Sequence, residues 1–225
     1  MWLDKLEYKF RRFGIPNLML YIVIGSAIVA LFDIILSLKG GITLSSLLYF
    51  SPTLIMKGQI WRIVTFVLVP PATSSLFFLL ISLYFYYFVG TSLENAWGTF
   101  RFTVYYLVGM IGSIIAGCIS GVGTVFYLNM SLFFAYAAIF PERQVLLFFV
   151  IPIKVKYLGL LDAAFFVFQI IVSPWSEKLA AIMAIANFLI FFGPSFISNI
   201  SRQVKNKKRR DEFFEKGANT FNRRF

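Results

Sequence analysis

Long apolar runs, separated by short segments that hold the charges and the prolines, restrict the fold of this chain more than any other feature. Of its 225 residues, 59% are hydrophobic and 14% are charged, whereas soluble domains carry about 25% charged residues. A soluble core of this length could not hide so much apolar surface, so the excess has to face lipid. The sequence therefore predicts an all-α polytopic membrane protein.

A spanning helix needs about 20 mostly apolar residues, and the runs predict six spans: 17–38, 73–97, 102–120, 124–140, 157–172 and 178–197. Residues 39–72 are too rich in Gly, Ser and Pro to span. They are expected to form a loop in the membrane interface, with Trp61 as an aromatic anchor. The apolar stretch 145–153 is expected to lie along the surface. The membrane domain is thus 1–200, followed by a basic tail, 201–225.

The basic residues predict the orientation. With both termini in the cytoplasm, 17 of the 21 Lys and Arg residues lie on the inner side, as the positive-inside rule requires. The net charge of +11 then indicates contact with anionic lipids, chiefly through residues 202–210, rather than with nucleic acid.

Small residues indicate close helix packing, because lipid tails offer no hydrophobic contrast between helices. The third expected span contains Gly109, Gly112 and Gly117, and the sixth contains Gly193. These two spans are expected to be central in the bundle.

The chain has no histidine and a single cysteine, Cys118. These absences exclude a Ser–His dyad and zinc sites of the His or Cys type; we expect no metal and no cofactor. Three acidic residues lie in or near spans, where charge is costly and often functional. Asp33 and Asp162 could share a proton as an aspartyl dyad, or each could lie near a helix end or cap a neighbour.

Two further charges are expected to organise the structure. Glu94 can accept hydrogen bonds from backbone amides of the following helix or pair with Arg101. Arg62 carries five donors and can tie loop carbonyls together. Alternatively, Arg62 is an ordinary interfacial arginine whose charged end reaches water.

Two motifs give the chain a resemblance to the rhomboid superfamily: Trp61-Arg62-x-x-Thr65-Phe66 and Gly90-x-x-Leu93-Glu94-x-x-x-Gly98-x-x-Arg101-Phe102. The stretch 140–158 also resembles the segment that joins helices four and five in that family. The resemblance implies a six-helix rhomboid-like bundle whose long first loop lies in the outer leaflet and is held by the Trp-Arg element.

The chain departs from active rhomboids at both catalytic positions. They carry Gly-x-Ser-Gly on helix four and a His on helix six, where this chain has Asn129-Met130-Ser131 and Asn187. The resemblance therefore implies an inactive, derlin-like pseudoprotease rather than an enzyme. Such proteins bind transmembrane clients in quality control or trafficking. Ser131 and Asn187 could also face each other inside the bundle.

Two alternative functions remain open at the level of sequence. One is an intramembrane protease that pairs Ser131 with Lys154 or Lys156, or that uses the two aspartates; the other is a small transporter. For location, the absence of a long regulatory domain favours a prokaryotic plasma membrane, with the endoplasmic reticulum as the alternative.

Overall fold

The computed structural model describes Tyr8 and residues 13–73, 75–121, 123–147, 151–175 and 178–192. The chain divides into two compact units, Met1–Asn187 and Phe188–Phe225. Of the second unit, the structure describes Phe188–Phe192, where the rings of Phe188 and Phe192 stack with centroids 4.6 Å apart. Gly193 and the basic tail lie outside the described residues.

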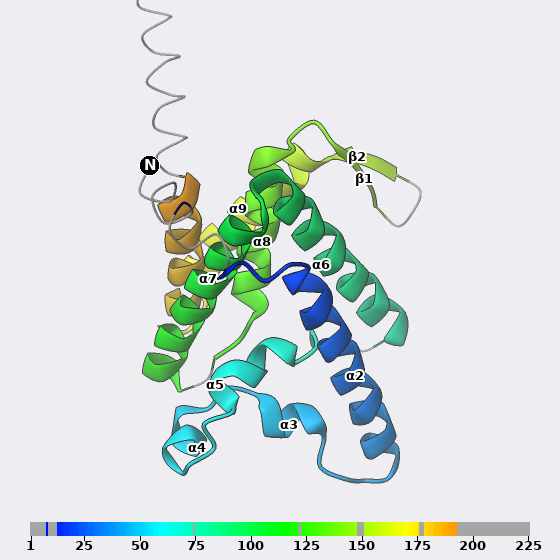
Figure 1. The fold of residues 1–225 in the computed structure, drawn as a ribbon, viewed down its shortest axis with the longest axis vertical. Coiled ribbons are helices and arrows are strands. Elements are labelled where there is room, and N and C mark those ends of the chain that lie inside the picture. The colour runs from blue at the N-terminus through cyan, green and yellow to red at the C-terminus, as the bar shows by residue number, and fades with distance from the viewer. Residues whose placement is uncertain are drawn as a thin grey trace, which may run out of the picture. The chain divides into compact units, whose positions relative to one another are not determined.

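Within the described residues, helices dominate (Figure 1). Four are long and apolar enough to cross a membrane: α2 (Leu18–Leu38), α6 (Leu76–Trp97), α7 (Thr99–Ser120) and α9 (Val155–Val172). Two apolar helices are shorter, α8 (Phe126–Ile139) and the helix Lys178–Phe192. The 14 residues of α8 span about 21 Å, less than the roughly 30 Å of a hydrocarbon core. A multi-pass helical membrane protein is confirmed. Among the described residues four helices qualify as candidate spans, and the six expected spans stay a prediction.

The turn between α6 and α7 is shorter than the sequence suggested. The third span was expected to begin at residue 102, but α7 begins at Thr99, so that Gly98 alone separates the two helices. Gly98 has φ 83° and ψ 156°, a region that is open to glycine and strained for residues with a Cβ. This one residue reverses the chain direction.

The loop 39–72 contains four short helical elements: α3 (Leu44–Leu48), α4 (Pro52–Met56), α5 (Arg62–Thr65) and the 3-10 turn η2 (Phe66–Leu68). Helices α3, α4 and α5 group at one end of the first unit (Figure 1). Phe50 pairs with Gly123 in an isolated antiparallel bridge, and its ring packs edge-on against Phe66 at 5.7 Å. The loop is thus folded onto the bundle.

The apolar stretch 145–153, for which the sequence indicated no secondary structure, contributes to a β-hairpin. Strands β1 (Gln144–Leu147) and β2 (Ile151–Lys154) pair antiparallel, with Val145 opposite Ile153. β-Branched residues favour strands and Pro152 disfavours a helix interior. The hairpin lies at the opposite end of the unit from α3–α5 (Figure 1).

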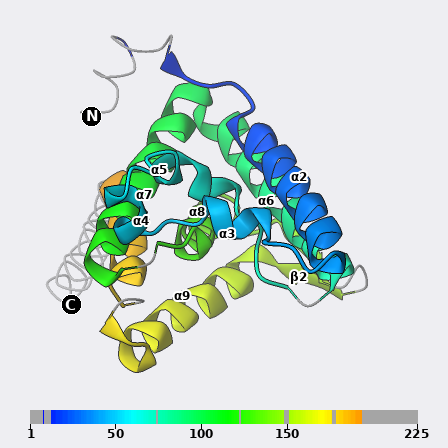
Figure 2. The same ribbon diagram turned by 90° about the horizontal axis from the view of Figure 1, so that it is seen from below.

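Helix α6 packs against α2, α7 and α8, whereas α9 packs chiefly against α8. Figure 2 shows α9 at the edge of the first unit. The core that joins α8 and α9 to the last helix consists of Tyr127, Phe166, Ala181 and Ala184. Among the described residues, one side of α9 therefore has no helical neighbour over much of its length.

Candidate functional site

Arg62 is buried inside the loop 39–72, with 2% of its surface exposed. Its Nε–H donates to Gln59 Oε1 at 2.7 Å, and its Nη1 donates to the carbonyls of Tyr49 and Ser46 at 2.9 and 3.2 Å. These carbonyls lie at the C-terminal end of α3, where helical carbonyls lack partners along the chain. Arg62 therefore ties α3 to α5, and its guanidinium also lies 4.9 Å from the centre of the Tyr49 ring.

The other residues of the Trp-Arg motif contact the same helix. Trp61 Nε1 donates to the carbonyl of Leu47 at 3.3 Å, and Thr65 Oγ1 donates to the carbonyl of Leu48 at 3.3 Å. Together with Arg62, these side chains donate to the four successive carbonyls of residues 46–49, at the end of α3. The motif thus shapes the loop and holds no reactive group.

Glu94 occupies the point where α6, α7 and the start of α2 meet. Its Oε1 accepts hydrogen bonds from the backbone N–H of Asn17 at 3.0 Å and from Thr99 Oγ1 at 3.1 Å. The predicted partners were backbone amides of the following helix or Arg101, whereas the observed amide belongs to Asn17, the residue that precedes α2. Arg101 lies half-buried in the first turn of α7.

Gly90 and Gly109, two of the glycines singled out in the sequence, permit neighbouring segments to approach their helices closely. A Cβ on Gly90 would lie 2.4 Å from Met19 Cγ, so that α2 and α6 meet there. A Cβ on Gly109 would lie 2.3 Å from Leu128 Cδ1 and 2.8 Å from Asn187 Nδ2. Gly112 has only ordinary contact with Met183 at 3.5 Å. The small face of α7 is therefore tight at Gly109 and looser at Gly112.

Ser131 and Asn187 do not bond to each other; Tyr105 of α7 binds both. The Tyr105 hydroxyl lies 2.5 Å from Ser131 Oγ and donates to the Ser131 carbonyl at 3.0 Å. Asn187 Nδ2 donates to the Tyr105 carbonyl at 3.4 Å. Tyr105 was missed in the sequence, although it lies four residues before Gly109 and so on the same helix face.

The two aspartates have separate surroundings. Asp33 accepts from the backbone N–H of Ser45 at 3.0 Å and from the Ser45 hydroxyl, so it caps the start of α3. Asp162 is 4% exposed, and neither of its carboxylate oxygens has a hydrogen-bond partner among the described residues. A proton-sharing dyad requires the two carboxyl groups to bond, and these do not.

Two cavities of about 600 Å³ each adjoin one another. The first, the loop cavity, lies between the loop and the starts of α6 and α8, and its lining includes Phe66, Pro70, Ser82 and Thr124. The second, the α6–α9 groove, lies between α6, α8 and α9 and is lined mainly by aromatic and aliphatic side chains. Tyr86, Phe126 and Asn129 line both cavities.

The α6–α9 groove opens on the side of the bundle. At its rim, Phe78 of α6 is 50% exposed and Leu161 of α9 is 67% exposed. Further in lie Phe85, Phe133 and Asp162. An apolar, aromatic groove with a few polar groups is the usual form of a binding site.

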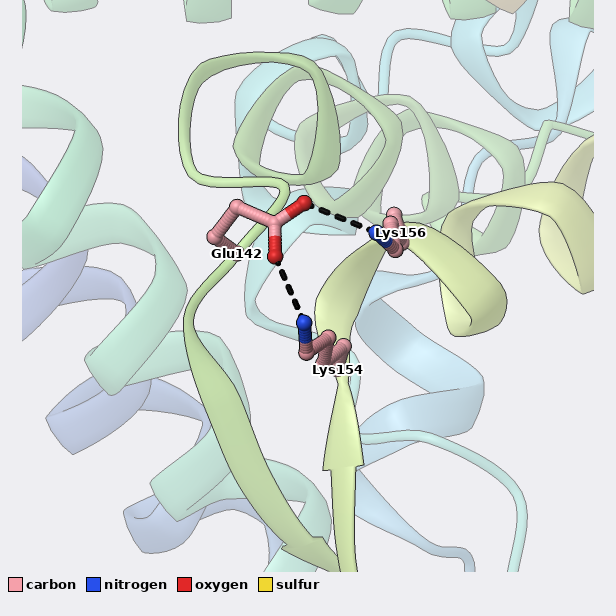
Figure 3. Close-up of polar contacts among 3 residues, drawn as sticks. All are labelled: Glu142, Lys154 and Lys156. Carbon is pink, nitrogen blue, oxygen red and sulfur yellow. Dashed lines mark hydrogen bonds and ion pairs between the residues drawn. The ribbon is translucent and has the colours of Figure 1, made fainter.

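The two lysines considered as alternative bases bind Glu142. Glu142 Oε2 accepts from Lys154 and Oε1 from Lys156, both at 2.8 Å (Figure 3). Both ion pairs join the segment after α8 to the hairpin and the start of α9. The hydrogen bonds from Lys154 and Lys156, with their positive charges, lower the pKa of Glu142 to about 2.

This lowered pKa predicts a pH dependence of the hairpin. Because the folded-state pKa lies below the ordinary value of 4.5, the contacts stabilise the fold above that pH and are lost as the pH falls toward 2. An NMR titration of the Glu142 carboxyl should have its midpoint near pH 2. In a K154M/K156M variant the midpoint should return to about 4.5; a midpoint there in the unaltered chain would contradict the pairing.

A comparison with curated proteins finds no match. A comparison with family models matches residues 16–193 to the family described as "Eukaryotic integral membrane protein (DUF1751)". The expectation of a prokaryotic plasma membrane is therefore wrong, because the matching family is eukaryotic. The match runs from the residues before α2 to the end of the last described helix. The chain therefore belongs to this family of eukaryotic integral membrane proteins.

Proposed function

We propose that the chain is a catalytically inactive, rhomboid-like membrane protein of the derlin-like type, which binds transmembrane segments of client proteins in quality control or trafficking. The observation that carries the proposal is the α6–α9 groove: about 600 Å³, apolar, aromatic and open on the side of the bundle. A transmembrane helix reaches such a groove by diffusing within the bilayer.

The surroundings of Ser131 argue against catalysis. The side chain is 1% exposed, so a peptide bond could not approach it without rearrangement. Its hydroxyl contacts Tyr105, and a phenol is protonated at neutral pH and cannot serve as a base. Asn187 is an amide and cannot take a proton at neutral pH either.

The short helix α8 supports a client-binding role. At about 21 Å it is shorter than the hydrocarbon core, and such mismatch thins the bilayer locally or draws polar groups inward. A client whose span is short or carries polar groups is destabilised less in a thinned region than in a bilayer of full thickness. We further propose six spans with both termini in the cytoplasm, and contact of the basic segment 202–210 with anionic lipids.

Site-specific photocrosslinking tests this function. A photoreactive residue at Leu161, on the rim of the groove, should form discrete adducts with transmembrane segments in the native eukaryotic membrane. Leu160 provides a matched control, because it is the preceding residue of α9 with 70% exposure against 67% for Leu161 but does not line the groove.

Preferential protein adducts at position 161 are the expected outcome. Equal labelling from positions 160 and 161 would show that the groove has no special role. Adducts with lipid alone at both positions would contradict client binding.

A further inference from the structure

Asp162 is the one acidic residue in the lining of the α6–α9 groove. It is the eighth residue of the 18-residue helix α9, about 10 Å along the axis from the start of that helix. This places the carboxylate toward the middle of the span rather than at its ends. It is nine-tenths buried, and both oxygens are without a partner among the described residues.

A carboxylate in apolar surroundings is costly unless a cation or several donors accompany it. The lining of the groove contains no lysine and no arginine. The other two carboxylates that lie within described spans both have hydrogen-bond donors: Ser45 at Asp33, and Asn17 and Thr99 at Glu94. Among these three carboxylates, the lack of a partner is therefore specific to Asp162 in the groove.

A second acceptor lies in the same groove. The side-chain oxygen of Asn129 is buried and also lacks a hydrogen-bond partner among the described residues, although the Asn129 side chain does bond to Tyr86. Both polar atoms are acceptors, so the complementary ligand is a donor, and next to a carboxylate the best donor is a cation. Aromatic neighbours such as Phe85, Phe133 and Phe165 suit the aliphatic stem and the charge of a basic side chain.

We propose that the α6–α9 groove selects transmembrane segments that carry a lysine or arginine near the middle of the span, and that Asp162 pairs with this residue. The inference rests on the proposed function, because it names the class of client. The position of Asp162, far from the ends of its helix, favours a protein ligand over a lipid with an amine headgroup. Lipid amines lie at the membrane surface, whereas Asp162 lies about 10 Å from the end of its helix.

Synthetic single-span peptides and the full chain in proteoliposomes test this selection, with binding measured by energy transfer. One peptide carries lysine at the centre of a Leu/Ala span, a second carries norleucine there, and a third carries lysine at the end of the span. The central lysine should strengthen binding about tenfold over norleucine, the range of polar contacts between helices in lipid. The terminal lysine should bind like norleucine.

Variants of the chain assign the effect to the carboxylate. Asp162→Asn, which preserves the side-chain shape, should remove the tenfold preference. Asp33→Asn removes the same charge from another span, where Ser45 contacts it, and should leave the preference intact. Asp162→Lys should reverse the preference toward a peptide with central glutamate.

The outcomes separate the two proposals. Binding of all three peptides with equal strength would overturn the selection by Asp162 and leave client binding in place. No binding of any peptide would contradict both. Crosslinking of phosphatidylethanolamine that depends on Asp162, with no preference among peptides, would replace the client with a lipid. The comparison between peptides uses the unaltered chain, so it stands even where a variant fails to fold.

Discussion

Replacing Arg62 by alanine should lower the unfolding temperature of the chain in lipid nanodiscs by about 10 °C. The change removes three hydrogen bonds and leaves the carbonyls of Ser46 and Tyr49 without their donor. A buried acceptor without a partner costs about 1–3 kcal/mol, so the total is roughly 3–5 kcal/mol. For a domain of this size, each kcal/mol lowers the unfolding temperature by about 2–4 °C.

Two variants control this experiment. Arg62→Lys keeps the charge but loses the planar fork of donors, so it should fall between the original chain and the alanine variant. Lys57→Ala removes an exposed charge from the same loop and should change the unfolding temperature little. An Arg62→Ala chain as stable as Lys57→Ala would show that Arg62 does not hold the loop.

Replacing Gly117 by alanine should destabilise the chain by about 1–3 kcal/mol, the usual cost of overpacking, and lower its unfolding temperature by about 5 °C. A Cβ at this position would lie 2.7 Å from two ring atoms of Phe50 and 2.9 Å from the Cα of Gly123. Phe50 is 1% exposed and paired with Gly123, so neither neighbour can move without shifting the loop.

Gly112→Ala is the matched control, since it makes the same change on the same helix. Its Cβ would meet Met183 at an ordinary 3.5 Å, and alanine favours helix over glycine by about 0.5–1 kcal/mol. This variant should be neutral or slightly stabilised in the same thermal measurement. Equal destabilisation by both substitutions would contradict the tight contact at Gly117.

The helices of the fold could be predicted from the sequence because lipid imposes a simple rule. Long apolar runs in a bilayer must satisfy their backbone hydrogen bonds within the segment, and α2, α6, α7 and α9 lie where the runs lie. The hairpin β1–β2 was not predicted, because a short apolar stretch carries no period long enough to separate a strand from a surface helix. The start of α7 was missed because Gly98 alone makes the turn.

The site could be predicted only in part. Charged residues in apolar runs stand out in a sequence, and Arg62, Glu94 and Asp162 were singled out in this way. Asp162, however, was expected to share a proton with Asp33, to lie near a helix end or to cap a neighbour, and not to line a groove. Their partners were not found, because a contact such as Asn17 with Glu94 joins residues 77 positions apart. Tyr105 was missed for a related reason: a tyrosine in an aromatic-rich helix is indistinguishable from its neighbours until α8 and the last helix are in place.

If the proposed function holds, the α6–α9 groove should receive a client span and leave it intact. The intact mass of a client crosslinked at position 161, after long incubation with the full chain in proteoliposomes, tests it most directly. A groove that binds the client without cleaving it should give one adduct whose mass is the sum of the two whole chains. A client fragment that ends within its transmembrane segment would contradict it.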